Sequence, residues 1–219
     1  MIAVDGPAGS GKSTAARAVA AQLGLRYLDT GAMYRALTWW LLQRDVPVDD
    51  AAAVAAAAGE PELSCGTDPA APTISVDGVD VAQQIRSRPV TNAVSAVSAV
   101  PEVRARLVEL QHTVIDAGGI VVEGRDIGTV VAPDAPVKVF LTASPPVRAE
   151  RRAAENAAEQ ASEATAAELA SRDAADSSRV VSPLQAAPDA VRIDTTDLTL
   201  AQVVERIVAL ATAAAAGAR

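Results

Sequence analysis

Cysteine, lysine and aromatic residues are all scarce in this chain of 219 residues. The single cysteine, Cys65, excludes an intrachain disulfide and favours a reducing compartment. The amino terminus passes from Met1 straight into apolar residues without a basic segment, and we find no apolar run long enough for a signal peptide or a membrane span. We therefore expect a cytoplasmic protein.

Positive charge is also in short supply, because 19 Lys and Arg stand against 27 Asp and Glu. The resulting net charge of -8 argues against broad binding to nucleic acid or to an anionic membrane. We therefore expect a monomer that acts on small molecules. Only 2% of the residues are aromatic, so the core must consist mainly of Val, Leu, Ile and Ala. Such a core suits helices packed on a parallel sheet.

Apolar and β-branched runs predict five short strands. They lie at residues 2–4, 27–28, 120–122, 137–141 and 191–193. Helical periodicity predicts helices at 13–23 and 200–210, and two alanine runs at 51–58 and 211–216 also favour helix. Residues 153–167 are predicted to form a polar, exposed helix. Strands that alternate with helices indicate an α/β fold with a parallel sheet and right-handed crossovers.

Between the second and third strands the pattern changes. Residues 73–81 alternate apolar and polar side chains around Asp77-Gly78, which favours a tight hairpin turn. A hairpin is unstable alone. We therefore predict a small antiparallel β insertion that packs as a lobe on the core, over roughly residues 60–85.

A glycine-rich segment follows the first predicted strand: Gly6-Pro7-Ala8-Gly9-Ser10-Gly11-Lys12-Ser13-Thr14. It fits the phosphate-loop pattern G-x-x-x-x-G-K-[ST], with a strand before it and a helix after it as that motif requires. We expect its backbone N–H groups to hold the phosphates of a nucleoside triphosphate, Lys12 to bridge the β- and γ-phosphates, and Ser13 to bind Mg²⁺. The alternative is a glycine-rich turn that merely joins strand to helix.

A phosphate loop alone does not identify a reaction. A GTPase is expected to carry an Asn-Lys-x-Asp segment, which this sequence lacks, so ATP is the better donor. Glu123 ends the third predicted strand and is the candidate that holds Mg²⁺ through water. Its alternative interpretation is a surface acid facing a helix. Asp5 and Asp29 also end strands, at the edge where ligands bind in such sheets.

Arginines are placed where phosphates would meet. In-line transfer between two phosphates gathers negative charge that cations neutralise. Arg35, Arg125, Arg172 and Arg179 lie in segments that also carry aspartates, and a further group follows the fourth strand: Arg148, Arg151 and Arg152. For any one of them a solvated surface charge is the alternative interpretation.

Four segments together resemble the bacterial cytidylate kinases. They are the phosphate loop, Leu28-Asp29-Thr30-Gly31-Ala32-Met33-Tyr34-Arg35, Gly124-Arg125-Asp126-Ile127-Gly128-Thr129-Val130-Val131, and Arg172-Asp173-x-x-Asp176-x-x-Arg179. The resemblance covers essentially the full length. It implies transfer of the γ-phosphoryl group of ATP to CMP or dCMP, with Mg²⁺ required.

The resemblance also implies roles for single residues. Arg35 and Arg125 resemble ligands of the acceptor phosphate, and Arg151 resembles an ATP ligand. The residues that resemble those recognising the cytidine are Thr30, Ser95, Arg104 and Asp126, with Ser95 and Asp126 suited to accepting from its exocyclic amine. Those on the sugar and phosphate side of the acceptor are Arg172, Asp176 and Arg179. The expected catalytic set is Lys12, Arg125, Asp126 and Arg179.

The expected fold is a doubly wound five-stranded parallel sheet flanked by helices, with the β insertion as an acceptor lobe and a short helical lid. The expected division is core 1–59, acceptor insertion 60–90, core 91–146, lid 147–180 and core 181–219. Four positions depart from the family pattern: His112, Glu123, Ala175 and Ser177. We interpret His112 as a helix-surface residue. Two other functions stay open, a kinase for UMP or a non-nucleotide alcohol, and an ATP-sensing module without turnover.

Overall fold

The computed structural model describes residues 1–158, 166–179 and 181–217. Its centre is a five-stranded sheet in the order β2-β6-β1-β7-β8, and every neighbouring pair is parallel. The strands are β1 Ile2–Asp5, β2 Arg26–Asp29, β6 Ile120–Gly124, β7 Val137–Thr142 and β8 Val191–Asp194. The five predicted strands are therefore confirmed, each longer by one or two residues.

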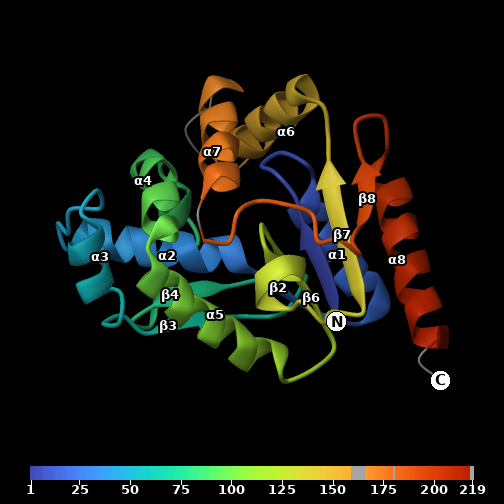
Figure 1. The fold of residues 1–219 in the computed structure, drawn as a ribbon, viewed down its shortest axis with the longest axis horizontal. Helices are drawn as coiled ribbons and strands as arrows, with labels where there is room; N and C mark the ends of the chain where they lie inside the picture. The colour runs from blue at the N-terminus through green and yellow to red at the C-terminus, as the bar shows by residue number, and fades with distance from the viewer. Residues whose placement is uncertain (159–165, 180, 218–219) are drawn as a thin grey trace.

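Helices cover both faces of this sheet (Figure 1). Alternate residues of β1 point to opposite faces. Ile2 and Val4 pack against α1 Lys12–Leu23 and α8 Leu200–Gly217, whereas Ala3 faces the second core. That second core is formed with α2 Thr30–Gln43, α4 Arg88–Ala99 and α5 Pro101–Ile115. The doubly wound arrangement is confirmed, with a core of aliphatic side chains on each side.

The insertion is a second, antiparallel sheet of three strands in the order β3-β4-β5, preceded by α3 Ala51–Ala57. Strands β4 Ile74–Val76 and β5 Val79–Asp80 form the predicted hairpin, and both turn residues, Asp77 and Gly78, have positive φ. The third strand, β3 Leu63–Cys65, was not predicted. Asp77 also accepts a hydrogen bond from Trp40 Nε1 at 2.9 Å, which attaches the hairpin to α2.

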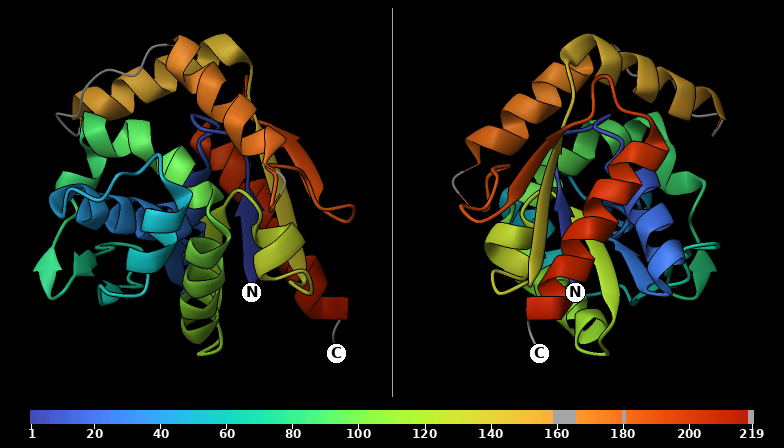
Figure 2. Two further views of the ribbon diagram at one scale, coloured as in Figure 1. Left: turned by 60° about the vertical axis from the view of Figure 1, so that its left-hand side comes forward. Right: turned by 90° about the vertical axis from the view of Figure 1, so that its right-hand side faces the viewer.

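Two helices lie above the carboxyl ends of the strands (Figure 2). They are α6 Pro145–Ala158 and α7 Ala166–Ser178, and they contain the two ends of the helix predicted at 153–167. The middle of that prediction, residues 159–165, lies outside the described part of the chain. Two short helical turns complete the chain, η1 Gln84–Arg86 and η2 Ile127–Val131.

Helix α8 corrects one expectation from the sequence. With 18 residues and a mean hydropathy of 1.4, it is long and apolar enough, by length and composition alone, to cross a membrane. Seven of its 18 residues are alanine, and Val203, Val204 and Ile207 bury one side of it in the core shared with α1. This packing gives the helix a place in a folded domain.

Candidate active site

The phosphate loop joins β1 to α1 at the carboxyl edge of the sheet. Gly6, Gly9 and Gly11 have φ values of 152°, 72° and 82°. A Cβ on Gly6 would lie 2.3 Å from the carbonyl oxygen of Leu141, and one on Gly9 would lie 2.4 Å from that of Arg148. Only glycine satisfies both the backbone and the space at these positions, so the loop curls tightly against β7 and α6.

Ser13 and Glu123 meet directly below the loop. Ser13 Oγ donates to Glu123 Oε2 at 2.8 Å, and the Tyr27 hydroxyl donates to the other carboxylate oxygen. Glu123 is 1% exposed, so its interpretation as a surface acid is wrong. Burial, followed by the negative charge of Asp29, raises the pKa of Glu123 to about 7, while Lys12 opposes that shift.

The pair Ser13 and Glu123 fits Mg²⁺. This ion takes hard oxygen ligands and is usually held by one or two protein groups together with substrate phosphates and water. Among the described residues no cluster of three or more His, Cys, Asp or Glu forms a complete metal cage. A buried carboxylate with a raised pKa beside a hydroxyl is the kind of partial site that a phosphate-bound divalent cation completes.

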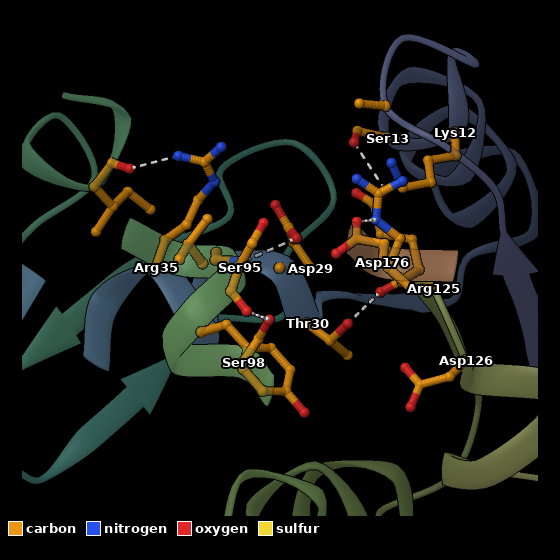
Figure 3. A pocket seen from close by; sticks show the side chains of 18 of the residues that line it. Lys12, Ser13, Asp29, Thr30, Arg35, Ser95, Ser98, Arg125, Asp126 and Asp176 are labelled. Carbon is orange, nitrogen blue, oxygen red and sulfur yellow. Dashed lines mark hydrogen bonds and ion pairs between the residues drawn. The ribbon is translucent and has the colours of Figure 1, made fainter. Parts of the chain in front are cut away.

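One pocket connects the phosphate loop to the arginines of the other segments (Figure 3). Lys12, Ser13 and Arg125 lie on one side and Arg35 on the opposite side. Arg179 lines the same pocket. The predicted convergence of loop and guanidinium groups on one cavity is therefore what the structure shows.

Asp176 on helix α7 pairs with two of these arginines. Arg125 Nε lies 3.1 Å from Asp176 Oδ2, and Arg179 Nη2 lies 3.0 Å from Asp176 Oδ1. Arg125 also donates to the Gly6 carbonyl oxygen at 2.8 Å, so it connects α7 to the phosphate loop. Arg179 Nη1 reaches Ser98 Oγ on α4 at 3.4 Å. Burial lowers the pKa of Arg179 and the neighbouring Asp176 opposes that shift.

The far end of the pocket has the groups of a base-binding site. The carboxylate of Asp126 pairs with Arg104, and both side chains are buried. Arg104 Nη1 also donates to the Ser98 carbonyl oxygen at 3.3 Å. Ser95 lines this end, whereas the Thr30 hydroxyl donates to the Glu123 carbonyl oxygen at 2.7 Å. A ring with complementary donors and acceptors would face Arg104, Asp126 and Ser95 together.

Arg35 approaches the pocket from α2. Its Nη1 donates to the Ile85 carbonyl oxygen and to Thr91 Oγ1, both at 3.0 Å. The side chain of Arg172 lies outside the described part of the structure, so its predicted position is not tested. His112 is exposed on α5, as expected, and its Nε2 lies 2.7 Å from the Val131 carbonyl oxygen.

Arg151 lies beside the phosphate loop, with its Nη1 3.7 Å from the position that a Cβ on Gly11 would take. It donates to Thr195 Oγ1 at 2.8 Å and to the Thr195 carbonyl oxygen at 2.7 Å. A second, more apolar hollow opens beside it, lined among others by Ser10, Gly11, Thr14, Leu198 and Val203. A flat ring attached to a loop-bound phosphate chain fits such a hollow.

Two site residues were missed by the sequence analysis. Ser98 lies one helical turn after Ser95 and contacts both Arg104 and Arg179. Asp173 pairs with Arg148 and accepts from the Ala8 N–H at 3.4 Å. Its spacing of three residues from Asp176 places both carboxylates on one face of α7, and this spacing was the available signal.

Two known bacterial proteins are more than half identical to this chain over almost its whole length. The cytidylate kinase from Streptomyces coelicolor is 60% identical over 96% of this chain and 91% of its own length. The cytidylate kinase from Streptomyces avermitilis is 58% identical over the same shares. A solved gluconokinase from Sinorhizobium meliloti is 19% identical over 97% of this chain and 92% of its own, with a TM-score of 0.47.

A match to the family described as cytidylate kinase extends over residues 2–213. This span contains the phosphate loop, the insertion, both helices above the loop and every pocket residue named above. By this match and by relatives at 58 and 60% identity, the chain belongs to the cytidylate kinase family and is a kinase.

Proposed function

We propose that this protein transfers the γ-phosphoryl group of ATP to CMP and dCMP, giving ADP and CDP or dCDP, with Mg²⁺ bound. The observation that carries the proposal is the single pocket lined both by Lys12 and Ser13 of the phosphate loop and by Arg104, Arg125 and Asp126. A phosphate donor and a base-bearing acceptor both fit this pocket. A sensor of ATP would need only the first of these two ends.

The donor side is the phosphate loop with the hollow beside Arg151. The backbone of residues 6–14 holds the phosphates, and Lys12 follows the γ-phosphate through transfer. Arg151 and the hollow beside it hold the adenosine. Ser13, together with Glu123 through water, would hold Mg²⁺, which would supply charge neutralisation for the phosphates of ATP.

The acceptor side is held by the arginines. Arg35, Arg125 and Arg179 bind the phosphate of CMP, and Asp176 with Arg172 binds its sugar. An oxygen of this phosphate forms the new bond to the γ-phosphorus while the bond to the β,γ-bridging oxygen breaks, and its electron pair leaves with ADP. The attacking oxygen is already anionic, so no general base is required, and catalysis consists of positioning and charge neutralisation.

The base is selected by Asp126, Arg104, Ser95 and Thr30. A carboxylate that accepts from the exocyclic amine of cytosine faces a carbonyl in uracil, and a buried acceptor opposite a carbonyl is left unpaired. Asp126 is already paired with Arg104. The pair therefore presents a donor and an acceptor together, which matches the N3 and amine edge of cytosine.

The same proposal describes a monomer in the cytoplasm that acts on small molecules and binds neither nucleic acid nor membrane, in keeping with its net charge of -8. Residues 60–90 and 147–180 are then the acceptor lobe and the lid, and residues 1–59, 91–146 and 181–219 form the core. Closure of lobe and lid over both nucleotides excludes water from the transferred group.

A turnover panel tests this function. The protein is incubated with Mg-ATP and each of CMP, dCMP, UMP, AMP and GMP, and ADP release is measured for wild type and Asp126→Asn. We expect CMP and dCMP to be preferred by wild type, and the ratio of kcat/KM for CMP over UMP to fall by about 10-fold or more in the variant. A wild type that prefers UMP, or a ratio unchanged in the variant, contradicts the proposal.

A further inference from the structure

Four buried polar atoms that make no hydrogen bond of standard geometry belong to three side chains beside the base end of the pocket. They are Tyr34 Oη, Arg104 Nε, and both Gln111 Oε1 and Gln111 Nε2. The three residues are 8, 4 and 0% exposed, so bulk water does not solvate these atoms. A buried polar atom left unpaired costs roughly 1–3 kcal/mol. Such a concentration at one place requires a physical explanation.

The three side chains belong to one contact between α2 and α5. Arg104, Leu107 and Gln111 are buried on the same side of α5, at helical spacing. The Arg104 guanidinium carbon lies 5.4 Å from the centre of the Tyr34 ring. Burial raises the pKa of Tyr34 to about 12, and the Arg104 charge and the Gln111 carboxamide both oppose this rise. Gln111 is therefore close to the Tyr34 hydroxyl.

The cluster of Tyr34, Arg104 and Gln111 stands directly against the acceptor site. Tyr34 and Arg104 line the pocket with Asp126 and Ser98, and Gln111 lies behind them. Its chemistry is complementary: the Arg104 Nε–H is a donor, the Gln111 carboxamide offers one acceptor and two donors, and the Tyr34 hydroxyl is both. Small side-chain rotations would pair these groups.

We propose that Gln111 is a positioning residue for the pyrimidine base of the acceptor. Its carboxamide orients the Tyr34 hydroxyl and the Nε–H of Arg104, and through them it fixes the plane of the guanidinium that faces the base beside Asp126. This inference rests on the proposed function and adds a residue to its base-selecting group. Gln111 touches no substrate itself.

Packing alone does not account for a glutamine here. The neighbouring buried positions of α5, Val103 and Leu107, are apolar, and they fill the core without leaving polar atoms unpaired. Removing one partner of a buried hydrogen bond costs roughly 1–3 kcal/mol, whereas removing an amide that bonds to nothing is close to neutral. Stability alone therefore does not separate a structural role of Gln111 from a functional one, and KM for CMP compared with KM for ATP does.

The test is Gln111→Met, which keeps the length of the side chain and removes both polar atoms. We expect KM for CMP to rise about 10-fold while kcat changes less than about 3-fold, corresponding to about 1.4 kcal/mol of binding. KM for ATP stays at the wild-type value, and the preference for CMP over UMP falls. The thermal midpoint stays the same or falls, because the variant keeps the packing volume but leaves the Tyr34 hydroxyl without the carboxamide.

Leu107→Met is the matched control, one turn away on the same face of α5, and it keeps the wild-type KM for CMP. Tyr34→Phe removes the partner hydroxyl, and we expect Tyr34→Phe/Gln111→Met to raise KM for CMP no more than the larger single change. If Gln111→Met does not fold, Tyr34→Phe decides: a wild-type KM for CMP overturns the proposal.

The outcomes separate the two levels of inference. If wild type phosphorylates CMP and Gln111→Met keeps its KM and its selectivity, then the positioning role is overturned and the proposed function stands. If wild type does not use CMP, both are overturned. A rise in KM for ATP equal to that for CMP also contradicts the positioning role, since it indicates a general distortion of the pocket.

Discussion

Lys12 and Lys138, the only two lysines of the chain, offer a test with its own internal control. Lys12 lines the pocket, and its positive charge opposes the rise that burial causes in the pKa of both Asp5 and Glu123. Lys138 instead pairs with Asp189 at 2.7 Å and donates to the Pro133 carbonyl oxygen. The same ammonium group therefore lines the pocket at one position and supports the fold at the other.

Lys12→Met is expected to lower kcat by about 10³-fold, because a cation that follows the transferred group stabilises the transition state more than the ground state. Its circular dichroism and thermal midpoint stay close to wild type. Lys138→Met is expected to do the reverse, with activity within about 2-fold and stability lower by about 1–3 kcal/mol. Retention of more than a few per cent of activity in Lys12→Met contradicts its assigned role.

Asp5 gives the molecule a pH-dependent stability. Its carboxylate accepts from the N–H groups of Ile127 and Gly128 at 2.9 and 2.8 Å, yet burial outweighs these bonds and raises its pKa from 3.8 to about 6. The folded state therefore holds this proton more tightly than the unfolded state. Stability from this group is highest below pH 3.8 and falls as pH rises toward 6, by about 3 kcal/mol at most.

Urea unfolding of wild type and Asp5→Asn between pH 4 and 7.5 measures this effect. The unfolding free energy of wild type minus that of Asp5→Asn should fall as pH rises from 4 to 6 and should stay constant above pH 7. Glu123 has a raised pKa of its own, but its contribution cancels in the difference. A difference that does not vary with pH contradicts the shifted pKa.

At the scale of elements, strands β1, β6 and β7 of the parallel sheet could be predicted from sequence because each is a buried apolar run. Strand β3 could not be predicted in the same way. Leu63–Cys65 has only three residues, and it is a strand because β4 pairs with it. Short strands depend on their partner rather than on their own sequence.

Helix α7 is attached to the phosphate loop by Asp173. This carboxylate pairs with Arg148 and accepts from the Ala8 N–H, while Arg148 donates to the Ala8 carbonyl oxygen at 3.2 Å. Asp173→Asn removes the charge from this contact, which is partly buried and worth about 1–2 kcal/mol. Opening of α7 away from the loop should become about 5–30 times more frequent.

Amide hydrogen exchange of α7 without nucleotide tests the Asp173 contact, since faster exchange reports more frequent opening. Ser177→Ala, on the exposed side of the same helix, is the control and should leave exchange unchanged. Equal exchange in wild type and Asp173→Asn means that α7 is held by its other contacts, above all by Asp176 with Arg125 and Arg179.

At the scale of the whole molecule, the sequence predicted which residues line the pocket but not which of them contact one another. The phosphate loop, Arg125 and Arg179 were predicted to converge because they follow strand ends or share a motif, and they line one pocket. The contacts of Asp173 with the loop and of Ser98 with Arg179 depend on how α7 packs between the loop and α4. Local sequence does not specify such packing.

A ligand that fills both ends of the pocket should stabilise the whole chain. Adenosine and cytidine joined through five phosphates carry the four phosphates of the two substrates and one more to span the in-line transition state. At 100 times its Kd such a ligand adds about 2.7 kcal/mol to the free energy of unfolding, which corresponds to a rise in Tm of about 5–10 °C.

Diadenosine pentaphosphate, the matched control, should raise Tm less because Arg104 and Asp126 face a purine in place of cytosine. Thermal unfolding at equal ligand concentrations with Mg²⁺ measures both shifts. Equal shifts would mean that the base end of the pocket does not read the acceptor, and a shift retained in full by Lys12→Met would mean that the phosphates do not lie in the loop.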